Sequence, residues 1–449
     1  GRGGAGRQGL DRIDALMRSP LRSPLRAFLA STATLTLSCA GAGILAFPWA
    51  LSQSRLPAFL LCGGLVAATC FVGMSILSAH TTESATRYEA IVRRELGEWT
   101  AKLVWAAIIS QQLGTLIGFL VAVSDYFSEL GLQPEAMLPS AAALLLWPLS
   151  LLSRLDALWL PTALSIAAVG AVVSVIVLRA VQHTECPAGE PPVDLLSRPS
   201  AEGLLVSLPI VVFGFNAHLQ TPIVCAEVLT LCQKARVARR VMTAAIASAL
   251  ALCAALYTAA ALAGTLCYGE GVRNDILGSL AHAASSADDR LAGTAATAMA
   301  AHLLLAYPVV LYPLLLEAPG MAGTRVRPEA DGGAAPPSGA TLREPLLGGA
   351  GRRRRRSAAR SAAVIGFSVA VALLAGARLN VVFSVIGGTV GSALTCWLPA
   401  ALLAKRTRAA WRQREVTSAD MLRRSAVGVL LVLVGVGAFT GTLVTVGLA

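Results

Sequence analysis

The sequence is poor in charged residues and in aromatic rings. Only 14% of its 449 residues are charged and 5% are aromatic, whereas charged residues make up about 25% of an ordinary soluble domain. Hydrophobic residues reach 55%, and the mean hydropathy is +0.67. This balance excludes a soluble globular domain and indicates a polytopic membrane protein. The apolar runs do not alternate with polar residues as the strands of a membrane barrel do, so the fold class is predicted to be all-α.

The sequence also lacks the motifs of common enzymes and metal sites. Its nine cysteines show no CxxC or Cys/His metal spacing, and no Ser-His-Asp, HExxH, phosphate-loop or paired-carboxylate arrangement occurs. We therefore expect neither an enzyme nor a bound metal or cofactor. An ion channel is disfavoured as well, since no span carries the polar lining or charged ring that a pore needs. Whether Cys186 and Cys267, both on the predicted outer side, form a disulfide is left open.

What the sequence does contain is a series of apolar runs of about 20 residues, the length that a helix needs to cross the hydrocarbon core. We predict about eleven spans, at 27–51, 56–79, 102–128, 137–153, 157–181, 203–229, 240–267, 289–316, 361–377, 380–404 and 424–447. Residues 1–26 are predicted to be an N-terminal tail, and residues 27–449 the membrane domain. Residues 317–357, rich in Gly, Ala and Pro, are predicted to be a disordered loop.

The formal net charge of +12 is explained by topology, so no nucleic acid partner is expected. If the N-terminus is cytoplasmic, nearly all Lys and Arg residues fall in cytoplasmic segments, as the positive-inside rule requires. The exceptions are Arg55, Arg179, Arg198, Arg273, Arg290 and Arg378. We therefore predict an integral membrane protein with a cytoplasmic N-terminus.

Basic segments next to the spans offer contacts with lipid. One run can anchor the topology or hold anionic lipid headgroups; it consists of Arg352, Arg353, Arg354, Arg355 and Arg356. Residues 81–95 are polar and favour a helix, which indicates a surface helix between two spans. Residues 405–424 carry Trp411 among basic residues and are expected to lie along the membrane interface.

Two spans carry residues that interrupt a helix. The first contains Gly-Ala-Gly at 41–43 followed by Pro48, and the sixth contains Gly214 and Pro222 around a polar centre. Glycine and proline weaken a helix interior. Two interrupted spans, five spans apart, are typical of transporters built from inverted repeats. Residues 27–181 and 203–404 would form two repeats of five helices, with the helix at 424–447 as an addition.

The chemistry of such a break is specific. Free backbone amides, together with the positive end of a half-helix, favour a carboxylate, and free carbonyl groups can hold an ammonium group or a cation. Irregular backbone at membrane depth occurs only where protein or water satisfies it. The two breaks therefore indicate a cavity for a zwitterion.

The residues resemble the amino acid/auxin permease family, which includes the sodium-coupled neutral amino acid transporters and the vacuolar amino acid transporters. The resemblance rests on four motifs in order along the chain. They are GAGILAFPWAL at 41–51, FGFNAH at 213–218 with Pro222 and Glu227 after it, YPVVLYP at 307–313, and FSVIGGTVGSALTCWLPAAL at 383–402.

The resemblance implies the eleven-helix fold of the bacterial leucine transporter, with broken helices 1 and 6, and secondary active transport of amino acids by alternating access. It places the substrate between these two helices. The amides of Gly41, Ala42 and Gly43 would face the substrate carboxylate, and backbone oxygens near Leu37, Ser38 and Phe213 would face its amine. The side-chain pocket would be shaped by Phe213, Phe215 and Asn216.

The sequence departs from the family's sodium-coupled members. Where those have an asparagine in helix 1 and a threonine in helix 8, this sequence has Leu37 and either Leu304 or Ala306. Aliphatic side chains cannot coordinate sodium, so we favour coupling to protons, with sodium as the alternative. Histidines inside spans are candidates for proton coupling, and here they are His218 and His302. The alternative for each is a neutral ring bonded to a backbone carbonyl.

A different class of function is a transporter-like sensor, which would bind amino acids and signal through its cytoplasmic segments. The sequence does not name the amino acid or the direction of transport. It also leaves open whether the protein lies in the plasma membrane, the vacuolar membrane or another endomembrane. The oligomeric state is left open as well.

Overall fold

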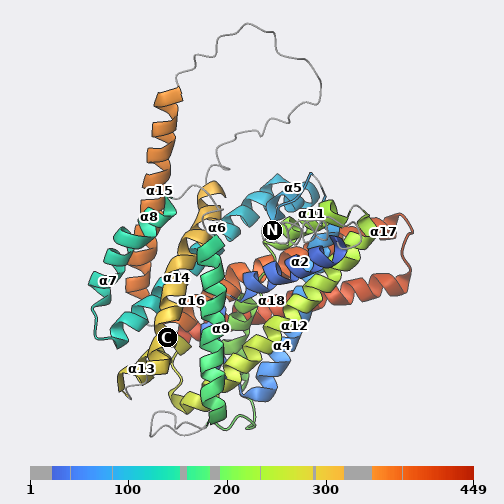
Figure 1. Cartoon of the computed structure of the whole chain (residues 1–449). Helices are drawn as coiled ribbons and strands as arrows, with labels where there is room; N and C mark the ends of the chain where they lie inside the picture. Colours follow the sequence, from blue (N-terminus) through green and yellow to red (C-terminus); the bar gives the residue numbers. More distant parts are fainter. Residues whose placement is uncertain are drawn as a thin grey trace, which may run out of the picture.

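The computed structural model describes residues 23–40, 42–82, 84–151, 159–182, 193–232, 234–286, 290–317, 346–376 and 378–448. Within these ranges the chain is nearly all helical (Figure 1). Seven helices are long and apolar enough to cross a membrane, or eight if one bent pair counts as a single span. The all-α polytopic class is thus confirmed, whereas the count of eleven stays a prediction because several apolar runs form shorter or interrupted helices.

The N-terminal half of the described chain consists of helices that follow the first five predicted spans. They are α2 (Ser23–Cys39), η1 (Ala42–Ala46), α3 (Phe47–Ser54), α4 (Leu56–His80), α5 (Tyr88–Leu96), α6 (Glu98–Glu129), α7 (Pro134–Ala141), η2 (Ala142–Leu146), α8 (Trp147–Ser150) and α9 (Trp159–Gln182).

The C-terminal half contains the second interrupted span and two long helices at the chain end. Its elements are α10 (Ala201–Gly214), α11 (Thr221–Cys232), α12 (Ala235–Tyr268), η4 (Gly269–Gly271), α13 (Ile276–Ser286), α14 (Arg290–Glu317), α15 (Leu346–Ala375), α16 (Leu379–Ile386), η6 (Gly387–Gly391), η7 (Ala393–Trp397), α17 (Leu398–Arg412) and α18 (Ser418–Leu448).

Helix ends follow local sequence signals. Ser200 caps α10, because its hydroxyl accepts a hydrogen bond from the Gly203 amide at 2.8 Å. Gly97, with φ of +95°, separates α5 from α6, a conformation that favours glycine. Of the surface helix predicted at 81–95, only the second half is helical, as α5, which begins at Tyr88 and buries Tyr88, Ile91 and Val92.

Three predicted boundaries are corrected by the structure. Helix α2 begins at Ser23, inside the expected tail, and α15 begins at Leu346, so residues 346–357 of the expected disordered loop are helical. Residues 405–424 do not form a separate interfacial helix, because they extend α17 and begin α18 around a turn at 413–417. Ala, Leu and Arg are strong helix formers, so helices that begin in the membrane continue through these segments.

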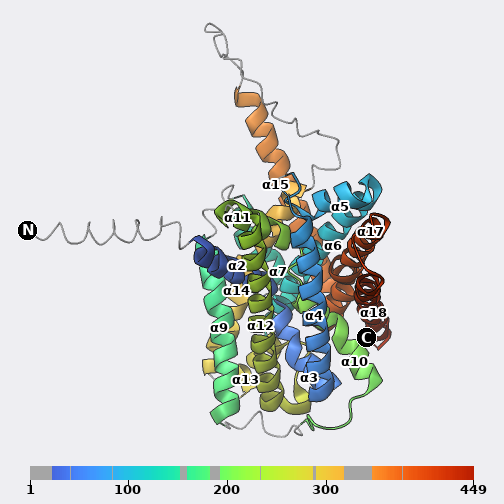
Figure 2. The same cartoon turned by 90° about the vertical axis from the view of Figure 1, so that its right-hand side faces the viewer.

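The centre of the bundle is formed by the interrupted spans and the helices around them. Helix α12 packs on α2, α3, α4 and α9, and α10 packs on α3, α16, η6 and α18; Figure 2 shows α9, α12 and α4 running alongside one another. Glycines allow the closest approaches. There is no room for a Cβ atom at Gly387 against the Pro209 carbonyl, or at Gly388 against Thr442. The Gly-Gly pair of the 383–402 motif therefore serves helix packing.

Candidate functional site

Both predicted interruptions are present in the structure. Helix α2 ends at Cys39, a short η1 turn follows, and the axes before and after this first break differ by 51°. At the second break α10 ends at Gly214 and α11 begins at Thr221, with residues 215–220 outside any helix. Gly43, Pro48, Gly214 and Pro222, which predicted the breaks, lie at them or within one turn.

The two breaks contact each other. A Cβ atom at Gly43 would lie 3.1 Å from the Cα atom of Gly214 and 3.4 Å from the ring of Phe213. Gly214 in turn faces the ring of Phe47, which would lie 2.6 Å from an added Cβ. Glycine at position 43 thus has a packing reason, in addition to the amide role expected from the sequence.

Helix α12 supplies donors for carbonyl groups at both breaks. The Tyr257 hydroxyl donates to the Gly214 carbonyl at 2.8 Å, and the Cys253 thiol donates to the Thr36 carbonyl at 3.7 Å. The last carbonyls of a helix have no partner within it. Since Tyr257 and Cys253 are four residues apart, they lie on one face of α12. This face donates to one carbonyl at each break, and the Thr36 carbonyl also accepts a hydrogen bond from the Ala40 amide at 2.7 Å.

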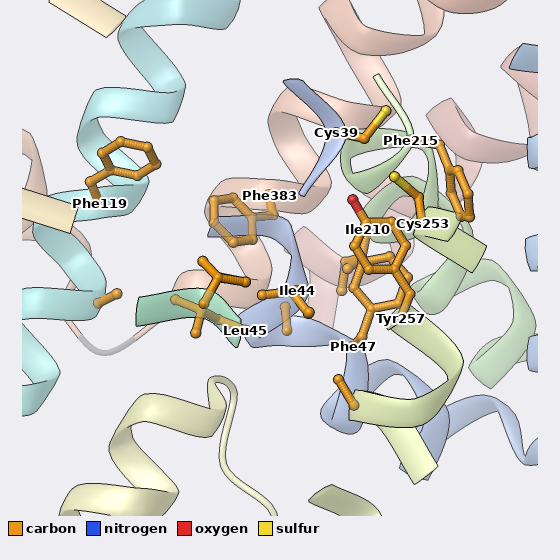
Figure 3. Packing of buried hydrophobic residues seen from close by; sticks show 14 of the residues in the cluster. Cys39, Ile44, Leu45, Phe47, Phe119, Ile210, Phe215, Cys253, Tyr257 and Phe383 are labelled. Atoms are coloured by element: carbon orange, nitrogen blue, oxygen red, sulfur yellow. The ribbon is translucent and has the colours of Figure 1, made fainter. Parts of the chain in front are cut away.

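Aromatic side chains pack around the same point. Tyr257 stacks on Phe47 with ring centroids 4.5 Å apart, and Phe215 meets Tyr257 edge-on at 5.1 Å. Figure 3 shows this group, with the side chains of Cys39 and Cys253 next to the Tyr257 ring. The breaks are therefore enclosed by a tightly packed aromatic cluster.

Phe213 has its own partner on the opposite side. Its ring stacks on Phe383 of α16, with centroids 4.4 Å apart and planes inclined by 19°. Of the two phenylalanines expected to shape the side-chain pocket, Phe213 is partly buried and Phe215 is fully buried. Phe213 is thus the more accessible of the two at the break.

The second break carries buried polar side chains that lack partners. His218 is fully buried, and neither ring nitrogen has a hydrogen-bond partner among the described residues. The Asn216 side-chain oxygen accepts a hydrogen bond from the His218 amide at 3.4 Å, while its side-chain nitrogen has no partner in the described part of the chain. A buried unsatisfied polar group costs about 1–3 kcal/mol, so a function has to be considered for it.

The His218 ring lies between α4 and η7. A Cβ atom at Gly73 would be 2.6 Å from its Nε2 atom and 3.0 Å from the Thr395 carbonyl oxygen. Glycine at position 73 leaves the space that the imidazole occupies. The ring is therefore held beside the break by two neighbouring helices.

The other predicted residues are placed differently. His302 is buried on α14, which packs mainly on α9 and α6. The Ser38 hydroxyl donates to the Thr34 carbonyl of its own helix at 2.7 Å. Ala42 begins η1, and Gly41 lies outside the described residues, as does Cys186, so its pairing with Cys267 is untested.

Comparison with protein families shows to which family the chain belongs. The model of the family described as transmembrane amino acid transporter protein matches residues 27–443. The chain belongs to this family of transmembrane amino acid transporters. It is therefore a membrane protein of a transporter family and not an enzyme, and the resemblance given above is confirmed.

The similar proteins have low sequence identity to this chain. Solute carrier family 38 member 8 of Mus musculus is 28% identical over 320 residues, which cover 66% of this chain and 70% of that protein. Sodium-coupled neutral amino acid transporter 7 of Bos taurus is 22% identical over 292 residues, covering 61% and 60%. Amino acid transporter AVT6B of Arabidopsis thaliana is 23% identical over 330 residues, covering 66% and 68%.

Among solved structures, the crystal structure of MhsT in complex with L-phenylalanine aligns with 94% of this chain and 97% of its own chain. The TM-score is 0.47 and the sequence identity 12%.

Three side chains of this family member were missed as site residues by the sequence reasoning. Tyr257 and Cys253 lie in an alanine-rich span without a motif. Phe383 begins the family motif at 383–402, for which the sequence predicted no contact with the substrate. The available signal was the spacing of Cys253 and Tyr257, which places a thiol and a phenol on one helix face. Only the fold shows that this face meets the two breaks.

Proposed function

We propose that this member of the transmembrane amino acid transporter family is a secondary active transporter that moves amino acids by alternating access, with protons as the coupling ion. The observation that carries the proposal is the contact of the two helix breaks at Gly43 and Gly214. Broken helices that meet within a membrane bundle offer free amides and half-helix ends to a charged substrate.

The substrate's carboxylate would bind at the first break, where the amides of Gly41, Ala42 and Gly43 precede α3. Its side chain would contact Phe213, which is the partly buried aromatic residue at the breaks. Phe215 and Asn216 would shape the pocket without direct contact with the substrate, since Phe215 is packed against Tyr257. These roles follow from the family motif and from the positions described above.

Proton coupling is supported by what surrounds the breaks. The positions that correspond to sodium ligands hold aliphatic side chains, and two carbonyls at the half-helix ends already accept hydrogen bonds from Tyr257 and Cys253. His218, by contrast, has two buried ring nitrogens without partners among the described residues. Histidine changes charge near neutral pH, so His218 is our first coupling candidate and His302 the second.

The test is uptake of radiolabelled amino acids into proteoliposomes of the full chain, driven by an imposed pH gradient or an imposed sodium gradient at equal membrane potential. We expect uptake under the pH gradient. Uptake under the sodium gradient alone would reject proton coupling and keep the transporter. Amino acid binding without uptake under either gradient would favour the sensor instead.

Two topological proposals accompany this function. The N-terminus is proposed to be cytoplasmic, on the basis of the asymmetry of Lys and Arg. The arginine run 352–356, now placed within α15, is proposed to meet anionic headgroups at the same membrane surface. Labelling of single introduced cysteines from either side of intact cells would test the orientation.

A further inference from the structure

A groove lies between α17 and α18, away from the two breaks. Its volume is about 570 Å³, and Figure 1 shows the two helices as a hairpin at the edge of the bundle. The α17 wall is made of small residues, Ala400, Ala401 and Ala404, and the α18 wall contains Val429 and Val432.

The groove lies between helices that pack on each other. At one end there is no room for a Cβ atom at Gly435 against the indole of Trp397, the last residue of η7, so α18 lies close to the start of α17. At the other end the turn at 413–417 joins them. Between these points, alanines on α17 and Gly428 on α18 leave the space unfilled.

The walls of the groove are apolar and accessible. Val429 is 58% exposed, Leu433 61% and Trp411 44%. In a membrane such a surface contacts hydrocarbon, and tryptophan is enriched at the level of the headgroups. Trp411 therefore places the hairpin end of the groove at the membrane interface.

Two arginines line the groove, Arg408 on α17 and Arg424 on α18. Within the described part of the chain, none of the ion pairs involves either of them. The carboxylate of Asp420, near the start of α18, accepts a hydrogen bond from the Thr417 hydroxyl at 2.9 Å. Two guanidinium groups at one cavity repel each other unless an anion lies between them, and guanidinium binds phosphate through paired hydrogen bonds.

We propose that this groove binds one anionic phospholipid, with its phosphate between Arg408 and Arg424 and an acyl chain along the alanines and valines. An amphiphile is required because a free phosphate would leave the apolar walls uncovered. A zwitterionic lipid fits less well, since its own cation would face the arginines. On the predicted topology the arginine end lies at the cytoplasmic surface, where anionic lipids are concentrated.

The experiment is native mass spectrometry of the purified full chain with phosphatidylglycerol or phosphatidylcholine, compared with the double variant R408Q/R424Q. Since each basic residue near the surface contributes on the order of 1 kcal/mol to anionic lipid binding, phosphatidylglycerol binding should weaken by about 30-fold. The matched control is R406Q/R412Q, which removes the same total charge, here from α17 alone, at residues that do not line the groove.

A second pair of variants tests the groove itself. Ala404→Trp fills it and leaves both arginines in place, so it should also abolish phosphatidylglycerol binding. Ala409→Trp on the same helix, outside the lining, should leave binding unchanged. Equal loss in both arginine variants, or full binding in Ala404→Trp, would overturn the site because the lipid would then be held by general surface charge.

A measurement on the native sequence does not depend on folding of the variants. In nanodiscs, brominated phosphatidylglycerol should quench the fluorescence of Trp411 more strongly than brominated phosphatidylcholine, with Trp411→Phe giving the contribution to subtract. Equal quenching by the two lipids would reject selectivity for the anionic headgroup.

Discussion

At the first helix break, the carbonyls of Thr36 and Pro48 accept hydrogen bonds from Cys253 and Thr265 of α12, the latter at 2.9 Å. At the second break Tyr257 likewise satisfies the Gly214 carbonyl, but the buried His218 ring beside it has no partner among the described residues. Both breaks therefore have supported backbone. They differ in the buried polar group that has no partner among the described residues, which is the Thr36 hydroxyl at the first break and the His218 imidazole at the second.

The difference shows how two similar interruptions can divide their roles. A satisfied backbone bend can be held rigidly by packing, as the contact of Gly43 with Gly214 illustrates. Unsatisfied buried groups reduce stability and persist where they serve a function. We infer that the first break provides shape and backbone amides, whereas the second provides the titratable group.

The largest effect is expected for Gly43→Leu. The added side chain would meet the Gly214 Cα atom and the Phe213 ring, and overpacking of this kind costs about 1–3 kcal/mol. Amino acid uptake should fall to background. The matched control is Gly63→Leu on α4, where nothing lies within 4 Å of an added Cβ. If Gly43→Leu transports as well as Gly63→Leu, the contact of the two breaks is not needed for transport.

The next effect tests the second break. His218→Leu removes the unsatisfied ring, so the melting temperature should stay the same or rise. Uptake driven by a pH gradient should nevertheless fall by about tenfold or more, equivalent to ~1.4 kcal/mol, while exchange of amino acid across the membrane continues. Activity and stability thus move in opposite directions.

The control for this prediction is His80→Gln, since the His80 ring pairs with the Ile76 carbonyl at 2.8 Å at the end of α4. Its uptake should match the native chain. Unchanged pH-driven uptake in His218→Leu would make His218 a core residue and move attention to His302.

A smaller effect is expected when the hydrogen bonds from α12 to the backbone carbonyls at the two breaks are removed in turn. Tyr257→Phe keeps the ring stacked on Phe47 and leaves the Gly214 carbonyl without its donor, whereas Thr265→Val removes only the side-chain donor of the Pro48 carbonyl, which lies in the first turn of α3. The first should destabilise the fold by about 1–3 kcal/mol and the second by about 0.5–1.5 kcal/mol. Thermal unfolding and uptake measured on the same preparations should show a larger loss of uptake for Tyr257→Phe. Equal loss in both would remove the distinction between the breaks.

The smallest effect is expected for Glu95→Gln, which serves as a reference for the pH dependence of uptake. Partial burial raises the pKa of the Glu95 carboxyl, but hydrogen bonds from Lys405 and Arg94 outweigh it and lower the pKa below its ordinary value. A lowered pKa stabilises the fold above the unfolded value of about 4.3, and this contribution is lost as pH falls through the folded pKa. Glu95→Gln should therefore leave the profile of uptake against pH unchanged near neutrality. A shifted profile would show that His218 is not the sole source of pH dependence.

Much of the site could be predicted from particular residues. Gly41, Gly43, Pro48 and Gly214 predicted where the helices break, because backbone conformation depends on local residue type. Tyr257 could not be predicted as a partner of Gly214, since the two residues are 43 apart in sequence and only packing brings them together. The boundary of α15 was missed because composition alone does not show how far a helix extends beyond the membrane.

By itself the sequence determined the helical membrane class, the positions of both breaks and the resemblance to a family of amino acid transporters. These properties depend on local apolar length, on glycine and proline, and on motif order. The tertiary structure alone decided that α12 donates to a carbonyl at each break, that His218 is buried between α4 and η7 and that His302 lies on α14, which packs mainly on α9 and α6. Such contacts depend on how helices pack in three dimensions, where a side chain's neighbours are set by segments distant in the chain.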